Sequence, residues 1–172
     1  MKKLLLGLFL ILPFLIIAQP VDEFQQFNGR YDFTAFGNTL NLEENGLGGA
    51  CNILTESSAD LMLLPTQTLI SAHLYWAGSG SGDFNVELNG APITSSRTFA
   101  LNFNGLDFFA AYADVTSIVS INGNGTYTLS ELDLTGVIGP YCGGGTNFGG
   151  WSVIVIYEDL SLTLNQVTIF DG

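Results

Sequence analysis

The most constraining feature of the sequence is the segment 149–159, which opens with two glycines and is apolar on both faces of an extended chain. Alternate side chains of a strand point to opposite sides. One side here carries Trp151, Val153, Val155 and Tyr157, and the other carries Ser152, Ile154 and Ile156. Because apolar side chains on both sides must be kept from water, the pattern predicts a central strand with cover on each face.

A second segment, residues 68–76, has the same character. One side carries Ile70, Ala72, Leu74 and Trp76, and the other carries Ser71, His73 and Tyr75. Two such strands facing each other across a core predict a sandwich. The composition agrees, because Gly, Thr, Asn, Phe and Ile are plentiful and no helical stretch rich in Lys, Glu and Ala is present. The expected fold is all-β, an antiparallel β-sandwich of the jelly-roll kind.

The N-terminus has the pattern of a secretion signal. Lys2 and Lys3 form a basic start, residues 4–17 are apolar, and Ala18-Gln19 offers a cleavage point. An uncleaved anchor is the alternative, although the run is short for a helix that spans a bilayer, which needs about 20 apolar residues. No Cys follows the run, which argues against lipid attachment.

This pattern sets the expected organisation of the chain. We predict a signal peptide over residues 1–18, an N-terminal lead-in over 19–28 and one β-sandwich domain over 29–172. About 150 residues are enough for one domain with its own core. The chain stops on Asp171-Gly172, a pair that normally opens a hairpin, so we expect the domain to be incomplete and part of a longer protein.

Charge excludes several kinds of partner. Without Lys2 and Lys3, the chain keeps only Arg30 and Arg97 against 16 Asp and Glu, a net charge of −14. Such a surface repels phosphate backbones, so nucleic acid is a poor partner, and so is an anionic membrane once the signal is cleaved. The acidity suits solubility outside the cell.

Two cysteines, Cys51 and Cys142, lie far apart in a chain that carries an export signal. An even number of cysteines in an exported chain indicates a disulfide, so we predict that the two are paired. A free thiol nucleophile is the alternative. Only one His is present, and it is not near either Cys in sequence.

Turn signals divide the rest of the chain into short strands. Asn89-Gly90 and Asn104-Gly105 each separate two strand-like runs, which predicts two hairpins. Asp114 is placed to cap one or two helical turns, the only helix expected. The expected strands are residues 31–35, 59–64, 68–76, 84–88, 91–94, 97–103, 106–112, 126–134, 149–159 and 167–170.

Six motifs carry a resemblance to a known group of proteins. They are residues 72–80 (AHLYWAGSG), 83–86 (DFNV), 113–116 (ADVT), 123–129 (GNGTYTL), 150–159 (GWSVIVIYED) and 167–172 (VTIFDG). Together they resemble a recurring domain of large exported Bacteroidetes cell-surface proteins, over the stretch from about Gly29 to the end of the chain. The signal peptide that ends in Ala18-Gln19 also looks like that of the same phylum.

The resemblance implies a β-sandwich near the N-terminus of secreted or surface-exposed proteins. Many of these proteins carry a gliding-motility-associated C-terminal domain and leave by the type IX secretion system, and the larger ones look like adhesins. The motifs are structural, and the resemblance supplies no catalytic residues. No C-terminal sorting domain is present in this chain, so the export route does not follow from the match.

Glu131 and Asp133 form the sharpest candidate for catalysis. Strand alternation would put both carboxylates on one face, roughly 6–7 Å apart, within the range used by two-carboxylate glycoside chemistry. The pair also resembles the start of the Glu-x-Asp-x-x-Glu motif of laminarinase-type hydrolases. Thr135 and Gly136 follow, however, and the third carboxylate is missing. A solvated strand face is therefore the favoured interpretation.

Acidic and amide side chains offer oxygen ligands for calcium, although neither an EF-hand nor a repeated calcium spacing is present. His73 stands alone, which gives no zinc site and no triad, so we expect it to serve packing or a hydrogen bond. Several aromatic side chains are candidates for a sugar-stacking platform, with core filling as the alternative. The candidate calcium ligands are Asp83, Asn85, Glu87, Asp107 and Asp114, and the candidate stacking rings are Tyr75, Phe108, Phe109, Tyr112, Tyr141 and Phe148.

The expected function is that of a non-catalytic, secreted or cell-surface β-sandwich with a structural or adhesive role in a larger exported protein. A carbohydrate-binding module, supported by calcium or not, is the second expectation, and a glycoside hydrolase that uses Glu131 and Asp133 is the third. We assign no catalytic, cofactor-binding or metal residues and no cofactor. The expected partners are an extracellular surface or polysaccharide and downstream domains of the same protein.

Overall fold

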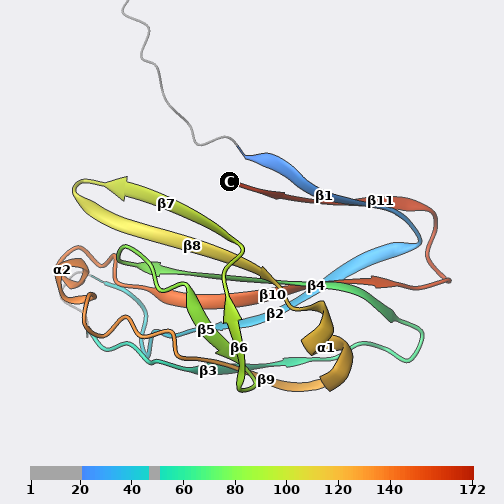
Figure 1. Cartoon of the computed structure of the whole chain (residues 1–172), viewed down its shortest axis with the longest axis horizontal. Helices are drawn as coiled ribbons and strands as arrows, with labels where there is room; N and C mark the ends of the chain where they lie inside the picture. The colour runs from blue at the N-terminus through green and yellow to red at the C-terminus, as the bar shows by residue number, and fades with distance from the viewer. Residues whose placement is uncertain (1–20, 47–50) are drawn as a thin grey trace, which may run out of the picture.

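A computed structural model describes residues 21–46 and 51–172 (Figure 1). The predicted signal peptide lies outside the described residues. Two short helices accompany the strands, α1 (Thr116–Asn122) and α2 (Gly139–Cys142). The strands are β1 (Asp22–Gly29), β2 (Tyr31–Thr39), β3 (Ser57–Leu61), β4 (Thr68–Ser79), β5 (Asn85–Leu88), β6 (Ala91–Thr94), β7 (Arg97–Phe103), β8 (Leu106–Asp114), β9 (Gly125–Ser130), β10 (Gly149–Glu158) and β11 (Asn165–Asp171).

The strands form three antiparallel sheets that lie in layers. The middle layer is a five-stranded sheet in the order β2-β10-β4-β8-β7. A four-stranded sheet, β3-β9-β5-β6, covers one of its faces, and a two-stranded ribbon, β1-β11, lies over part of the other (Figure 1). The predicted all-β sandwich is therefore confirmed, with the ribbon as an additional layer.

The central strand β10 lies where the sequence predicts it. Its position relative to residues 68–76 differs from the prediction. β10 lies between β2 and β4, and Trp151 and Val153 are in register with Trp76 and Leu74 of β4. The two strands are hydrogen-bonded neighbours in one sheet, so the expectation that they face each other across the core is wrong. Both have two apolar faces because their shared sheet is covered on both sides, a condition that alternation alone does not distinguish from opposed strands.

The main core lies between the five-stranded and four-stranded sheets. Trp76 and Trp151 are almost fully buried in it, beside Tyr127 of β9. Each indole N–H is satisfied: Trp76 donates to the Asp83 carbonyl oxygen at 2.8 Å, and Trp151 donates to Ser57 Oγ at 2.9 Å. The core therefore takes both tryptophans without leaving a buried donor unpaired.

A smaller core lies between the five-stranded sheet and the ribbon. Ile156 of β10 is fully buried there against Phe27 of β1 and Ile169 of β11. The predicted N-terminal lead-in, residues 19–28, includes most of β1. Phe24 and Phe27 of β1 are spaced irregularly because the β1–β11 register shifts between Glu23 and Gln25. That shift hides the strand from a search for strict alternation.

The turn signals are confirmed. Asn89 and Gly90 have φ angles of 51° and 73°, and Asn104 and Gly105 have 54° and 79°. Positive φ at both central positions is the geometry of the tight turn that matches strand twist, and Asn-Gly tolerates it best. The two turns close the β5–β6 and β7–β8 hairpins.

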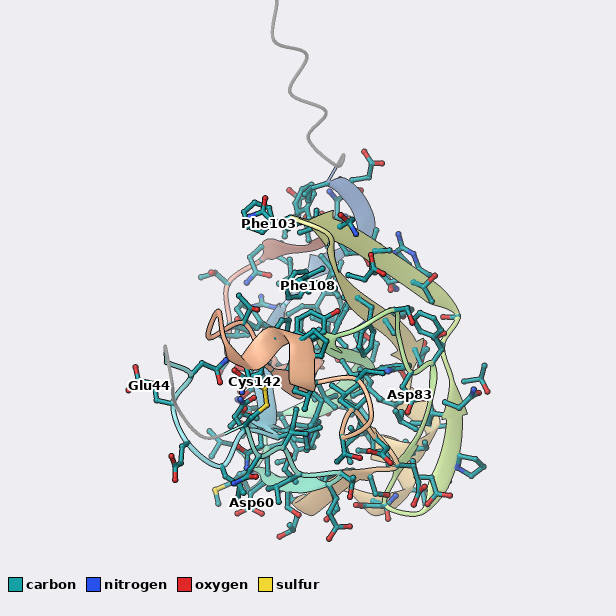
Figure 2. The ribbon with its side chains drawn as sticks, turned by 90° about the vertical axis from the view of Figure 1, so that its left-hand side faces the viewer. Glu44, Asp60, Asp83, Phe103, Phe108 and Cys142 are labelled. Carbon is teal, nitrogen blue, oxygen red and sulfur yellow. A yellow bond between two sulfur atoms is a disulfide. The ribbon has the colours of Figure 1, made fainter. Side chains whose placement is uncertain are left out.

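The predicted disulfide joins Cys51 to Cys142, whose Cα atoms are 5.5 Å apart. It ties the loop after β2 to α2, and its sulfur atoms are visible in Figure 2. Such a bond fits an oxidising compartment. Helix α1 follows Asp114, whose Oδ1 accepts a hydrogen bond from the Thr116 N–H at 2.8 Å, although the N-cap position itself is Val115. The second helix, α2, is not predicted by the sequence pattern. No helix in the described part of the chain is both long and apolar enough to cross a bilayer.

Removal of this disulfide should destabilise the domain strongly. In the Cys51→Ser/Cys142→Ser double variant, the unfolded chain regains the freedom of a loop closed over a separation of 91 residues. The expected loss is about 4–5 kcal/mol in the free energy of unfolding, measured by urea denaturation. The reduced wild type serves as the control and should match the variant. Equal stability of the oxidised wild type and the variant would contradict the expectation.

Candidate functional site

The ribbon covers only part of the outer face of the five-stranded sheet. It lies over the part that carries Ile154, Ile156 and His73, and it ends at Asp171. The rest of this face is hollowed by three connected shallow depressions of about 270, 310 and 240 Å³, the first of which reaches Gly172. We call this region the open trough and define it by Tyr75, Ala77, Phe99, Leu101, Phe108, Ala110, Phe148, Gly150 and Ser152.

Small residues from three adjacent strands form the floor of the open trough. Ala77 of β4 is in register with Gly150 of β10 on one side and with Ala110 of β8 on the other. Their neighbours Trp76, Trp151 and Ala111 point through the sheet into the main core. The strands are thus bulky on the core side and nearly flat on the outer side, which creates the depth of the trough.

Aromatic side chains form one end of the open trough. The rings of Phe108 and Phe148 are nearly parallel, with centroids 6.0 Å apart and planes inclined by 15°. Phe108 also contacts the edge of Tyr141, with centroids 5.4 Å apart, and Tyr141 donates from its hydroxyl to the Asp107 carbonyl oxygen at 2.7 Å. In Figure 2, Phe103 and Phe108 are labelled toward the top of the view, where the β1–β11 ribbon lies, and Cys142 is labelled below them.

The opposite end of the trough is closed by a polar contact between the ribbon and the sheet. Asp171 of β11 pairs with Arg97 of β7 and accepts a hydrogen bond from the Tyr75 hydroxyl at 3.0 Å. The Arg97 guanidinium also lies 4.3 Å from the ring centre of Phe24 in β1. Burial, followed by this hydrogen bond, raises the pKa of Tyr75, so the phenol stays neutral and donates at physiological pH. Arg97 therefore holds both ribbon strands to the sheet.

The candidate stacking rings separate into two groups. Phe108 and Phe148 line the open trough and Tyr75 reaches it, whereas Phe109, Tyr112 and Tyr141 are buried. Phe108 and Phe148 stack on each other instead of lying side by side in one plane. Three of the six candidate rings thus lie at the trough, and the other three fill the interior, which is the alternative expected for them.

Glu131 and Asp133 do not lie on a strand, contrary to the expectation for residues 126–134. β9 ends at Ser130, and Glu131 has a positive φ of 64°, which breaks the extended backbone. Both carboxylates are exposed, while Leu132 and Leu134 between and beyond them are buried. Hydrogen bonds from the Thr135 hydroxyl and N–H lower the pKa of Asp133, so this carboxylate is a capped, ionised surface group.

The candidate calcium ligands are dispersed. Asp83 accepts from the Asn85 N–H and, across 50 residues of sequence, from the Asp133 N–H. Asp107 accepts from the Asn102 amide and Asp114 from the Thr116 N–H, each within its own turn. Within residues 21–46 and 51–172, no three His, Cys, Asp or Glu side chains are arranged to hold a metal ion.

His73 lies beneath the ribbon and is almost fully buried. Its Nε2 is 2.8 Å from Ser71 Oγ, its Nδ1 is 3.0 Å from the Tyr112 hydroxyl, and Phe24 and Phe27 cover it, each with its ring centre 6.2 Å away. Burial lowers the pKa of His73, although the nearby Asp114 opposes this shift. His73 thus has the packing and hydrogen-bonding role expected from its isolation.

Comparisons with protein-family models, with curated proteins and with solved structures found no match for this chain. The function is therefore inferred from the surface itself.

His73 should make the domain less stable in mild acid. The pKa of His73 is lowered in the folded state. Its contribution to the free energy of unfolding is therefore complete above the ordinary pKa of 6.5. That contribution is lost as the pH falls below 6.5, because the unfolded chain then binds the proton more readily than the folded chain does. Urea denaturation near pH 7.5 and near pH 5.5 should show a loss in the wild type that is smaller in His73→Gln. An equal loss in both proteins would assign the effect to the carboxylates.

Proposed function

We propose that this chain is a non-catalytic, secreted or cell-surface β-sandwich module that has a structural or adhesive role in a larger exported protein. The open trough is its contact surface, and this uncovered apolar hollow is the observation that carries the proposal. The signal-like N-terminus and the Cys51–Cys142 disulfide support export.

The open trough has the properties of a surface that binds another molecule. A contiguous exposed apolar patch on a soluble domain marks an interaction site or a liability. Leu101, on its rim, is 57% exposed, and Phe103 beyond it is 60% exposed. The same face of the same sheet is covered by the ribbon where it carries Ile156 and His73. An adhesive contact would complete this cover.

The residues of the open trough suit binding more than catalysis. Acid–base or nucleophilic chemistry needs ionisable groups that converge on one point. Tyr75, Arg97 and Asp171 meet at one end of the trough, but they bind one another and hold the ribbon to the sheet. The other residues that define the trough are Phe, Ala, Leu, Gly and Ser. Glu131 and Asp133 lie outside this set and are solvated, so the hydrolase alternative has no support from their position.

Carbohydrate binding is the second candidate, and one feature favours it. Next to Phe148 is a polar hollow of about 620 Å³ lined by Thr39, Asn41, Leu42, Glu43, Glu44 and Asn45. An aromatic ring beside amide and carboxylate groups is a combination that can hold a sugar ring and its hydroxyls. Phe148 belongs to both the hollow and the open trough, so one bound polymer could use both.

A pair of leucine variants tests the proposal. Leu101→Glu places a charge on the rim of the trough, and Leu164→Glu makes the same change at a site in the β10–β11 loop that is 77% exposed. Beads coated with residues 19–172 should adhere to one or more surfaces in a panel of extracellular glycans and proteins, with and without calcium. Adhesion should fall by about tenfold in Leu101→Glu, because a buried charge costs more than 1 kcal/mol, and should persist in Leu164→Glu.

The thermal unfolding of both variants is the control for folding. Adhesion that is equal in the two variants would remove the open trough from the proposal. Adhesion that is lost when Glu44 is replaced but persists in Leu101→Glu would favour the carbohydrate alternative, because Glu44 lines only the hollow beside Phe148. Release of sugar products from a glycan would contradict the non-catalytic assignment.

A further inference from the structure

We propose that the open trough docks a two-stranded β-hairpin of another polypeptide, one whose inner face carries large apolar side chains and whose net charge is neutral or positive. This inference rests on the proposed function and names the class of partner. It follows from the position of the trough relative to the ribbon, the chemistry of the trough floor and the charge of the chain.

The first argument is continuity with an interface that the structure already contains. On β4 and β8, the ribbon contacts His73 and Tyr112, and the trough begins with Tyr75 and Ala110 on the same face. Figure 1 shows the ribbon ending beside the β7–β8 hairpin. The trough is therefore the unoccupied continuation of the layer that β1 and β11 begin.

The second argument is the hydrogen bonding of the occupant's backbone. The strands of the floor, β10, β4 and β8, are paired on both edges, so the face that they present is made of side chains. A single extended strand lying on this face would lose water from its own N–H and C=O groups without gaining partners. A hairpin pairs its own strands, and the β1–β11 ribbon uses this arrangement on the neighbouring area.

The third argument is shape. Gly150, Ala77 and Ala110 leave a hollow that only side chains from above can fill. Over the covered area, the ribbon inserts Phe24 and Phe27, which lie edge-on to the rings of Tyr112 and His73. A hairpin with Phe, Val or Ile at alternate positions would place large side chains over the small floor residues, as close packing requires.

The fourth argument is charge, which selects a different chain over a second copy. The chain without its signal carries −14, so two copies repel each other. Of its two arginines, Arg97 pairs with Asp171, and Arg30 donates to the Leu162 carbonyl oxygen. Glu43 and Glu44 are exposed beside Phe148, at the aromatic end of the trough. A basic residue at the end of the hairpin would find its counter-charge there.

A synthetic hairpin tests this inference directly. The probe is a fluorescent peptide of about 14 residues, closed by a D-Pro-Gly turn and a terminal disulfide, with Phe and Val on one face and Thr and Lys on the other. The control peptide has the same composition, with the apolar residues divided between the two faces. Binding is measured by fluorescence anisotropy with the folded, oxidised segment 19–172.

The hairpin should bind the wild type and Leu164→Glu with similar affinity. It should bind Leu101→Glu about tenfold more weakly, since the new charge on the rim would lose water beneath the bound hairpin. The control peptide should bind at least about tenfold more weakly than the hairpin to the wild type. A hairpin in which Glu replaces each Lys should bind more weakly than the original hairpin at low salt. The difference in affinity between the two hairpins should shrink at high salt, because salt screens the charges.

Several outcomes would overturn the inference. Equal binding of hairpin and control peptide would show nonspecific hydrophobic contact. Self-association of the wild type in sedimentation experiments that is abolished by Leu101→Glu would make a second copy the occupant. If the hairpin does not bind while bead adhesion still depends on Leu101, the hairpin is wrong and the proposed function stands. If neither depends on Leu101, both are wrong.

Discussion

The pairing of β10 with β4 is the contact on which the rest of the fold depends. These strands occupy the centre of the five-stranded sheet and carry Trp151 and Trp76 side by side into the main core. Each also has a second apolar or buried face, with Ile156 and His73 pointing away from that core. A sheet built on such strands needs cover on both faces where its side chains are large and apolar. The four-stranded sheet covers the central strands on one face, and the ribbon covers the other face only in part.

The partial cover explains why one region of the surface differs from the rest. Where the outer face is bulky, as at Ile154, Ile156 and His73, the chain supplies its own ribbon. Where the face is built from Ala77, Ala110 and Gly150, the hollow is shallow and the cost of exposing it is lower. The gradation from large to small side chains along β4, β8 and β10 therefore lets the domain fold with an apolar surface left open.

Much of the fold could be predicted from the sequence because most of its strands alternate cleanly and are bounded by clear turn signals. The Asn-Gly turns, the central strand and the Cys51–Cys142 pair each have a local signal with one dominant physical cause. The choice of neighbouring strands in a sheet has no such local signal. The pattern of residues 68–76 fits a strand opposite β10 as well as the neighbouring position that β4 occupies. The pattern does not predict β1, because a register shift disrupts its period. It predicts a strand at Glu131, because a positive φ leaves no trace in the alternation of side chains.

The candidate site was harder to predict for a related reason. Phe108 and Phe148 attract notice as aromatic residues, but the floor of the trough consists of alanine and glycine, which carry no chemistry of their own. Ala77, Ala110 and Gly150 become a site only when three strands distant in sequence align them in one row. A search of the sequence for polar clusters led instead to Glu131 and Asp133, which are solvated.

The disulfide has a consequence for the time at which the trough takes its shape. Cys142 is next to Tyr141, whose ring supports Phe108 from the side and whose hydroxyl is held by the Asp107 carbonyl. Oxidation of Cys51 and Cys142 thus anchors α2 and, through Tyr141, fixes the aromatic end of the trough. In a reducing cytoplasm the same chain would lack that anchor. On the proposed route out of the cell, the open trough would take its final shape only in the oxidising compartment, and its apolar surface would be less well formed before that.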